Sequence, residues 1–246
     1  MNVKKENKQK TIKRDLIKLA VFDFDGTIIP VQSGARLGFY MTYHRKLKLT
    51  TSFRLLWWGF RYKLRLPFNE ETSRKLIFKA FEGSDADEVD SYLDEFYKVC
   101  LKPYAREDII DRAKKLKEEG NYIVVVSATF EPVLKSFIKD GVFNDVVGTK
   151  MLKNDNNCYT GEVDGVPCAN EEKIARLAEY ANEKFGRGNW CVEYVFADHH
   201  TDKALLSLAV NPVAVDPDNK LERYAKNKKW EIIKYKREKR SKEKFN

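Results

Sequence analysis

The chain has 246 residues, 43% of them hydrophobic, so it is long enough for one large α/β domain or for a core domain that carries a smaller second module. No apolar run approaches the ~20 residues that a membrane span needs, because the longest, residues 55–60, ends at Arg61. The net charge of +9 resides in two basic tails, since residues 1–14 carry six Lys or Arg against one Glu and residues 234–246 carry seven against two.

The first predicted element is a buried parallel strand over residues 17–24. Residues 34 to about 102 then show helical periodicity and no clear strand. Ser84 with Asp87 three positions later has the spacing of a capping box, which places the start of a helix over residues 85–100 at Ser84. Pro103 ends this helical segment.

From residue 105 onward, predicted strands alternate with predicted helices. The helices are expected over residues 105–119, 130–140, 171–185, 201–209 and 217–227. The strands are expected over residues 122–126, 192–196, 212–215 and 230–233, with a strand or loop from 146 and a hairpin over 151–166. Gly120 should end the first of these helices, and Pro217 should stand in the first turn of the last. This alternation predicts an α/β fold with a doubly wound parallel sheet, into which an all-helical segment is inserted after the first strand.

Polar side chains follow the predicted strands at the point where each strand ends. Asp23-Phe24-Asp25-Gly26-Thr27 follows the first strand, Ser127-Ala128-Thr129 the second, and Asp198 with Asp202 the strand over 192–196. Lys173 stands at the start of the helix before that last strand. In open α/β sheets, sites form at the carboxyl ends of the strands, so we expect these side chains to share one rim.

This set of charges suits phosphoryl transfer. Four carboxylates would repel one another unless a hard divalent cation such as Mg²⁺ and a Lys compensated them. Asp23 and Asp25 are two residues apart on an extended segment, so both can face the same side. Catalysis of phosphoryl transfer consists mostly of positioning and charge neutralisation, which such a site would supply.

The order and rough spacing of these motifs, over residues 17–233, resemble the haloacid dehalogenase (HAD) superfamily of phosphohydrolases. Residues 23–27 resemble its first motif, Ser127 its second, Lys173 its third, and Asp198 with Asp202 its fourth. The helical insertion, the turn at residues 160–162 and the stretch over 211–218 resemble the phosphoserine-phosphatase-like branch, subfamily IB. The resemblance implies four parts: a Rossmann-like core of residues 17–30 and 103–233, a helical cap over 31–102, and basic tails over 1–16 and 234–246.

The resemblance also implies a role for each site residue. Asp23 would be the nucleophile that forms an aspartyl phosphate, and Asp25 the acid that protonates the leaving oxygen and then the base that activates water. The phosphate would be bound by Ser127, Ala128, Lys173, Gly26 and Thr27. Mg²⁺ would be held by Asp23, by the backbone carbonyl of Asp25 and by Asp198, with Asp202 supporting it from nearby. The implied activity is Mg²⁺-dependent hydrolysis of a phosphate monoester.

The cap would choose the substrate and exclude water. The aromatic residues Trp57, Trp58 and Phe60 fit either a cap core or a pocket for a lipid-like leaving group, which leaves a lipid or membrane contact of the cap open. Gln32 lies where phosphoserine phosphatases carry a Glu that contacts the substrate's amino group. A neutral side chain would not balance an ammonium charge, so phosphoserine is not favoured and the small-molecule substrate stays unassigned.

Two other functions remain open. A phosphomutase of this superfamily would use the same Asp pair but return the phosphoryl group to substrate, whereas a dehalogenase is disfavoured because it does not use a carboxylate at Asp25. A non-enzymatic protein could instead grip RNA or lipid with its basic tails. Such tails are more often solvated ends, so no nucleic-acid partner is expected. The basic N-terminus lacks the apolar stretch of a signal peptide, so we expect a cytoplasmic protein.

The cysteines and histidines do not form a zinc motif. Cys100, Cys158, Cys168 and Cys191 lack the CxxC spacing, so we expect four reduced thiols. His199 and His200 stand beside Asp198, but the family motif does not require them. We expect both to be exposed loop histidines.

Overall fold

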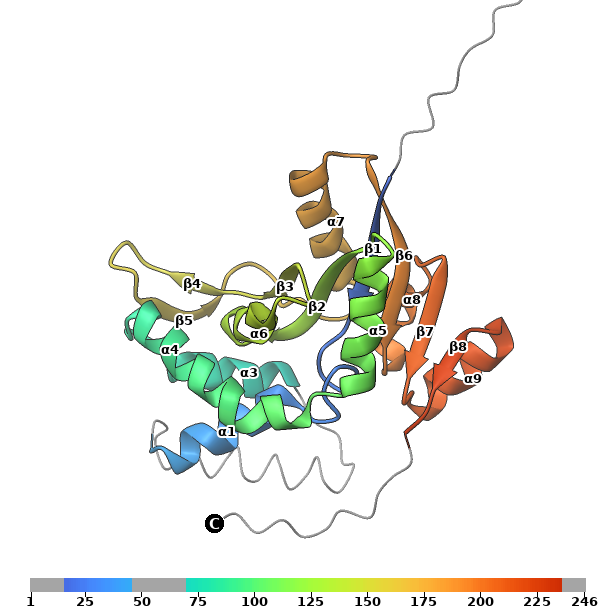
Figure 1. Ribbon diagram of the computed structural model, residues 1–246. Helices are drawn as coiled ribbons and strands as arrows, with labels where there is room; N and C mark the ends of the chain where they lie inside the picture. The colour runs from blue at the N-terminus through green and yellow to red at the C-terminus, as the bar shows by residue number, and fades with distance from the viewer. Residues whose placement is uncertain (1–15, 46–69, 236–246) are drawn as a thin grey trace, which may run out of the picture.

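The structure is a computed structural model that describes residues 16–45 and 70–235 (Figure 1). Most of both basic tails, residues 1–15 and 236–246, lies outside these ranges, and so do Trp57, Trp58 and Phe60. No helix in the described ranges is both long and apolar enough to cross a membrane.

The centre of the molecule is a six-stranded sheet in the order β3-β2-β1-β6-β7-β8, in which every neighbouring pair is parallel. The strands are β1 (Ile17–Phe22), β2 (Tyr122–Phe130), β3 (Asp145–Thr149), β6 (Trp190–Ala197), β7 (Asn211–Val215) and β8 (Glu231–Ile233). A separate antiparallel hairpin joins β4 (Met151–Lys153) to β5 (Tyr159–Val163). The predicted α/β fold with a doubly wound parallel sheet is therefore confirmed.

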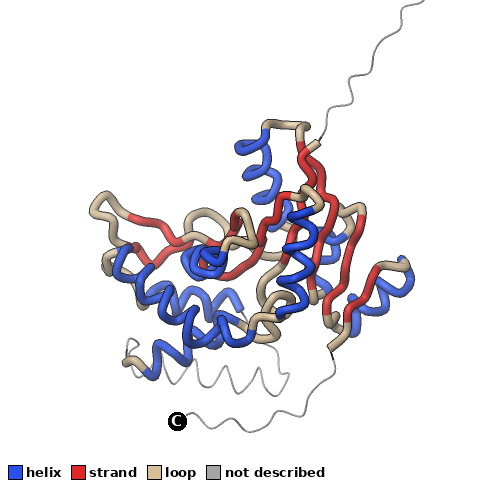
Figure 2. The backbone as a smooth tube through the Cα atoms, viewed as in Figure 1, coloured by secondary structure: helices blue, strands red, loops and turns tan. Residues whose placement is uncertain are grey.

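Helices cover both faces of the sheet (Figure 2). The longer ones are α1 (Ser33–Tyr43), α3 (Glu70–Lys79), α4 (Ala86–Phe96), α5 (Glu107–Glu118), α6 (Glu131–Phe137), α7 (Glu172–Phe185) and α9 (Asn219–Lys228). The shorter ones are the π-helical turn η1 (Tyr97–Leu101), the 3₁₀ turns η2 (Lys102–Tyr104), η3 (Ile138–Asp140) and η4 (His200–Asp202), and α8 (Lys203–Leu206).

Strand β1 contributes to two separate cores because its side chains alternate between the faces of the sheet. Ala20 and Phe22 pack in the core shared with α1, α3, α4, α5 and α6. Leu19 and Val21 pack in the core shared with α7, α8 and α9. A strand buried on both sides reads as a continuous apolar run, which is why this strand was recognisable from the sequence.

The three helices α1, α3 and α4, which follow β1 in the chain, gather near the end of the sheet where β1 terminates (Figure 1). They join the core through buried apolar residues such as Met41, Phe78 and Leu93. The β4–β5 hairpin lies against the same group, since Gly83 N donates to Tyr159 O at 2.8 Å. This helical group therefore packs at the end of the sheet where the strands have their carboxyl ends.

The structure corrects the predicted starts of two helices. The N-cap of α4 is Asp85, whose side chain accepts from Asp87 N and Glu88 N, so the predicted cap at Ser84 is wrong by one residue. Helix α9 begins at Asn219 with Asp218 as its N-cap, so Pro217 stands before the helix and not in its first turn. Both shifts have the same cause, because a carboxylate that can accept from free N–H groups stands one position closer to the helix.

Candidate active site

A buried ion-pair group lies where β1 and β6 end. Asp23, one residue beyond β1, is only 5% exposed, and its N–H donates to Phe196 O at 2.9 Å. Lys173, in the first turn of α7, places its Nζ 2.9 Å from Asp23 Oδ1 and 2.9 Å from Asp202 Oδ2. Three elements that are distant in the chain thus bring one ammonium between two carboxylates.

This group carries one more carboxylate than its single cation can balance. Burial raises the pKa of Asp23 to about 7, although the neighbouring Lys173 ammonium opposes the shift. Burial, together with Asp23 and Asp202, raises the pKa of Asp198 to about 8. Burial alone would lower the pKa of Lys173, but the two carboxylates outweigh it and hold that pKa above its usual value. The site is therefore short of positive charge.

The residues present fit a divalent cation that would supply this charge. Oxygen atoms of Asp23, Asp198 and Asp202 all lie within 4.8 Å of one another. Asp202 Oδ1 is buried and has no hydrogen-bond partner among the described residues, which is costly unless a ligand satisfies it. A cluster of carboxylate oxygens is the donor set that hard cations such as Mg²⁺ prefer.

Gly26 makes room for the carboxylate of Asp198. A Cβ added at this position would lie 2.0 Å from Asp198 Oδ2, far inside van der Waals contact. Gly26 also has a φ of +81°, a left-handed conformation that side chains disfavour. The loop after β1 can therefore approach the end of β6 only with glycine here.

Asp25 is held by two hydroxyl residues. Its carboxylate accepts from Ser33 N at 2.9 Å, from Ser33 Oγ at 2.8 Å and from Thr129 Oγ1 at 3.2 Å. Ser33 is the first residue of α1, and Thr129 belongs to β2. The orientation of Asp25 thus depends on the helical insertion as well as on the sheet.

The predicted phosphate-binding residues lie around this network. Ser127 is buried, and its Oγ donates to Thr129 Oγ1 at 3.2 Å, which links it to Asp25. The carbonyl of Ala128 accepts from Thr149 Oγ1 at 2.9 Å. Thr27 is fully buried, and its Oγ1 has no hydrogen-bond partner among the described residues. Gln32 immediately precedes Ser33 and therefore lies beside the Asp25 network.

Sequence reasoning missed Arg106, which braces the loop after β1. Its Nη1 donates to the carbonyls of Gly26 at 2.6 Å and Thr27 at 2.9 Å, and its guanidinium lies 4.1 Å from the ring centroid of Tyr235. Ser33 and Thr129 were visible as hydroxyl residues next to predicted site residues, but nothing in the sequence indicated that Arg106 returns to a loop 79 positions earlier.

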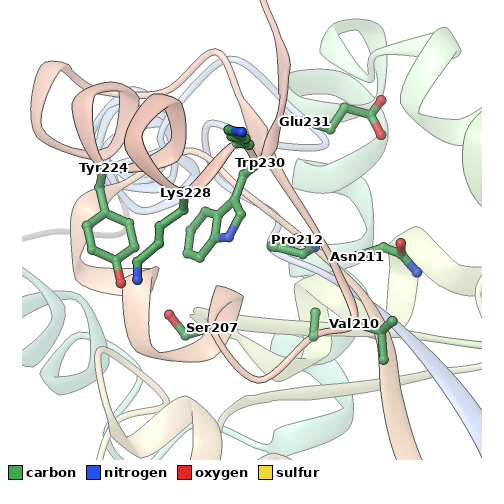
Figure 3. Close-up of a pocket in the computed structure, with 10 residues that line it drawn as sticks. Ser207, Val210, Asn211, Pro212, Tyr224, Lys228, Trp230 and Glu231 are labelled. Atoms are coloured by element: carbon green, nitrogen blue, oxygen red, sulfur yellow. The ribbon is translucent and has the colours of Figure 1, made fainter.

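A hollow of about 530 Å³ lies elsewhere, at the amino-terminal ends of β7 and β8 (Figure 3). Tyr224, Lys228 and Trp230 line it, together with Asn211 and Pro212. None of the carboxylates described above borders it. The hollow is therefore separate from the candidate active site.

Sequence comparison identifies a protein family and a relative that are similar to this chain. A family model described as haloacid dehalogenase-like hydrolase matches residues 20–207. A histidinol-phosphatase of Neisseria meningitidis serogroup C (strain 8013) is 23% identical over 244 residues, which cover 89% of this chain and 99% of that protein.

Solved structures share the fold at low sequence identity. A protein of unknown function from Bordetella pertussis Tohama I superposes with a TM-score of 0.77 and 22% identity, covering 89% of this chain and 98% of that one. A phosphoserine phosphatase, solved as an analogue of its phospho-aspartyl intermediate, superposes with a TM-score of 0.57 and 18% identity, covering 91% of this chain and 95% of that one.

Proposed function

Because this chain belongs to the haloacid dehalogenase-like hydrolase family, we propose that it is a Mg²⁺-dependent phosphatase that cleaves a small phosphate monoester through an aspartyl phosphate on Asp23. The observation that carries this proposal is the contact of one Asp23 oxygen with Lys173 at 2.9 Å, inside a group of three carboxylates that needs a cation. A buried carboxylate held in this way is positioned as a nucleophile rather than as a solvated surface charge.

In the first step, Asp23 attacks phosphorus while the bond from phosphorus to the leaving oxygen breaks. Asp25, protonated at this stage, gives its proton to the leaving oxygen, so the product leaves as a neutral alcohol. The hydrogen bonds from Ser33 and Thr129 orient the Asp25 carboxyl group for this transfer. The positive charge of Lys173 counters the negative charge that gathers on Asp23 and the phosphoryl oxygens.

In the second step, water attacks the phosphorus of the aspartyl phosphate. Asp25 now takes a proton from that water, and the bond between phosphorus and the Asp23 oxygen breaks. Inorganic phosphate leaves, Asp23 returns as a carboxylate, and Asp25 is again protonated. Both proton transfers use one residue, so Asp25 serves as acid and base in turn.

Asp23, Asp198 and Asp202, with the backbone carbonyl of Asp25, would hold Mg²⁺. The cation would neutralise the charge of the phosphate and of the clustered carboxylates when bound. We propose that residues 31–102 act as the cap that covers this site, because Ser33 at its start contacts Asp25.

Histidinol phosphate is our first candidate substrate, because a relative named histidinol-phosphatase spans 89% of this chain. Histidinol phosphate carries an amine but no carboxylate. Gln32, beside Ser33, could accept a hydrogen bond from that amine but would balance its charge no better than that of phosphoserine, so the candidate rests on the named relative. Phosphoserine is the natural comparison, since solved phosphoserine phosphatases share the fold.

The test is phosphate release from histidinol phosphate, phosphoserine, a sugar phosphate and a lysophospholipid phosphate, with Mg²⁺ and with a chelator. Asp23→Asn should lower turnover by at least about 10³-fold, because the nucleophile is lost. Asp155→Asn, an exposed aspartate in the β4–β5 turn, is the matched control and should keep full activity.

Equal amounts of alcohol and inorganic phosphate are expected as products. Phosphate that passes to a second substrate molecule in place of water would identify a phosphomutase. Undiminished Mg²⁺-dependent hydrolysis by Asp23→Asn would refute the proposed nucleophile.

A further inference from the structure

A second group of metal-type ligands lies next to the candidate active site. It consists of His199 and His200, which follow Asp198, and of Asp218, the N-cap of α9. Their candidate ligand atoms all lie within 4.8 Å of one another. His200 Nδ1 is 2.7 Å and His199 Nε2 is 3.6 Å from the same oxygen, Asp218 Oδ2.

The surroundings leave these atoms accessible and oriented. The side chain of His199 is 48% exposed and that of His200 is 36% exposed, so an ion can reach them from solvent. Asp218 Oδ1 accepts from Leu221 N at 2.7 Å, which caps α9 and turns Oδ2 toward the two imidazoles. The prediction of exposed loop histidines is confirmed for His199 only, because His200 is half-buried, begins the 3₁₀ turn η4 and contacts a carboxylate.

The ring of His199 is fixed in a way that suits a ligand. Its Nδ1 lies 3.0 Å from Thr201 Oγ1 and accepts from Thr201 N at 3.5 Å, so Thr201 orients the imidazole from its Nδ1 side. Metal binding through Nε2 would require the tautomer in which Nδ1–H donates to Thr201 Oγ1. Histidines that bind metals commonly donate their other ring N–H to such a partner.

We propose that His199, His200 and Asp218 bind a transition-metal ion of the zinc class, at a site separate from the one formed by Asp23, Asp198 and Asp202. Two imidazole nitrogens and one carboxylate oxygen suit Zn²⁺ and its neighbours, whereas Mg²⁺ prefers an all-oxygen set. The two sites would therefore select different metals although Asp198 and His199 are adjacent in the chain.

A bound ion would tie two parts of the molecule together. His199 and His200 belong to the segment after β6, and Asp218 is the N-cap of α9. The backbone already joins them, because Asp218 N donates to Asp198 O at 3.0 Å. An ion that binds only the folded state raises its stability, so Zn²⁺ should raise the melting temperature.

The test is calorimetric titration of the full chain with Zn²⁺ in the presence of saturating Mg²⁺, paired with thermal unfolding. The wild-type chain should bind one Zn²⁺ ion and unfold at a higher temperature with it. His199→Ala and Asp218→Asn should each weaken Zn²⁺ binding by at least about tenfold, the lower end of what disrupting a metal site costs. Asn can still accept from Leu221 N, so Asp218→Asn preserves the helix cap.

His44→Gln is the matched control, because His44 is the third histidine of the chain and lies at the C-cap of α1. It should bind Zn²⁺ like the wild type. Co²⁺ bound in place of Zn²⁺ should show ligand-field bands without thiolate charge-transfer absorption, which excludes the cysteines as ligands. Zn²⁺ binding that is absent from the wild type, or unchanged in either His199→Ala or Asp218→Asn, would overturn the proposal and leave His200–Asp218 as a hydrogen-bonded pair only.

Discussion

Gly26 shows how a single missing side chain can determine whether the site assembles. The carboxylate of Asp198 occupies the space that a Cβ at residue 26 would fill. Arg106 donates hydrogen bonds to the carbonyls of Gly26 and Thr27. The loop would have to break these hydrogen bonds in order to move away from Asp198 and make room for a larger side chain at residue 26. A substitution here must therefore displace Asp198 or break the contacts of Arg106.

We predict that Gly26→Ala lowers turnover by more than about 100-fold, because a displacement of about 1 Å in an active site can cost that much. Steady-state hydrolysis as a function of Mg²⁺ concentration measures this effect. Gly83→Ala is the control, since Gly83 also has a positive φ, +75°, but open space around its Cβ position. Both variants should lose about 1–3 kcal/mol of stability from backbone strain, yet only Gly26→Ala should lose activity.

The hydrogen bond from the Ser33 hydroxyl to Asp25 gives a second prediction about a single residue. Ser33→Ala removes the hydroxyl that donates to Asp25 at 2.8 Å but keeps the backbone donor. Turnover should fall by about tenfold, since general acid–base catalysis contributes roughly 10²–10⁴-fold and orientation is only part of it. KM should change little, and the pH profile of kcat should shift.

Ser91→Ala, in which a hydroxyl that bonds the carbonyl of Asp87 within α4 is lost, is the control for Ser33→Ala. It should leave both kcat and the pH profile unchanged. A Ser33→Ala variant with wild-type kinetics would remove Ser33 from the positioning of Asp25.

Several residues of the candidate site could be predicted from the sequence, because short stretches of sequence indicate where strands and helices end. Asp23, Asp25, Asp198 and Lys173 stand at strand or helix ends, positions that the apolar pattern of the chain indicates. Arg106 could not be predicted in this way, because its role depends on a contact between α5's N-cap and a loop about 80 positions earlier. No local pattern records such a contact.

At the scale of elements, α4 is tied to the core by ion pairs of Asp94. This carboxylate contacts Lys98 one turn later and Lys139 in the 3₁₀ turn after α6. Hydrogen bonds from Lys139 and Lys98 hold the pKa of Asp94 well below its usual value. The contact joins the helical insertion to the sheet-bearing part of the molecule.

We predict that Asp94→Asn lowers the free energy of unfolding at pH 7 by about 0.5–1 kcal/mol, the range for partly exposed ion pairs. A depressed pKa in the folded state stabilises above the pKa of the unfolded chain, near 3.8, and that contribution is lost as the pH falls further. The difference between wild type and variant should therefore shrink below about pH 4. Urea unfolding at several pH values measures it, with Asp155→Asn as the control. A difference that grows on acidification would contradict this account.

The order of elements was more predictable than their ends. Apolar runs indicated β1, β2, β6 and β7, which the structure contains in this order, since most of the residues of β1, β2 and β7 are buried and the last three of β6 are. Helix starts were less certain, because adjacent capping candidates compete, as Ser84 and Asp85 do. The backbone before this helix is hydrogen-bonded to Tyr159 in the hairpin through Gly83 and Ser84, a contact between distant parts of the chain that no local pattern indicates.

At the scale of the whole molecule, the site is a source of instability until a cation binds. Burial, together with the like charges of Asp23 and Asp202, raises the pKa of Asp198 to about 8. We predict that Asp198→Asn raises the stability of the metal-free protein by about 1 kcal/mol, as removal of functional strain often does. Mg²⁺ should stabilise the wild type and should fail to stabilise the variant.

Thermal unfolding of the wild type and of Asp198→Asn, with and without Mg²⁺, measures these effects on stability. Asp145→Asn is the control. Asp145 is satisfied by Lys184 and Tyr180, so its loss should destabilise the protein and leave the effect of Mg²⁺ intact. Equal stabilisation of wild type and Asp198→Asn by Mg²⁺ would exclude Asp198 as a ligand.

The strand order has a consequence for synthesis of the chain. Strand β1 emerges first, yet its partners pair through Leu19 with Tyr122 and through Ile17 with Trp190. During translation at roughly 5–20 residues per second, β1 must wait for many seconds before both of its edges are covered. Until then an apolar strand with open edges is exposed to aggregation. A nascent chain released before residue 190 would lack the neighbour β6, so we expect it to depend on chaperones and to carry no activity.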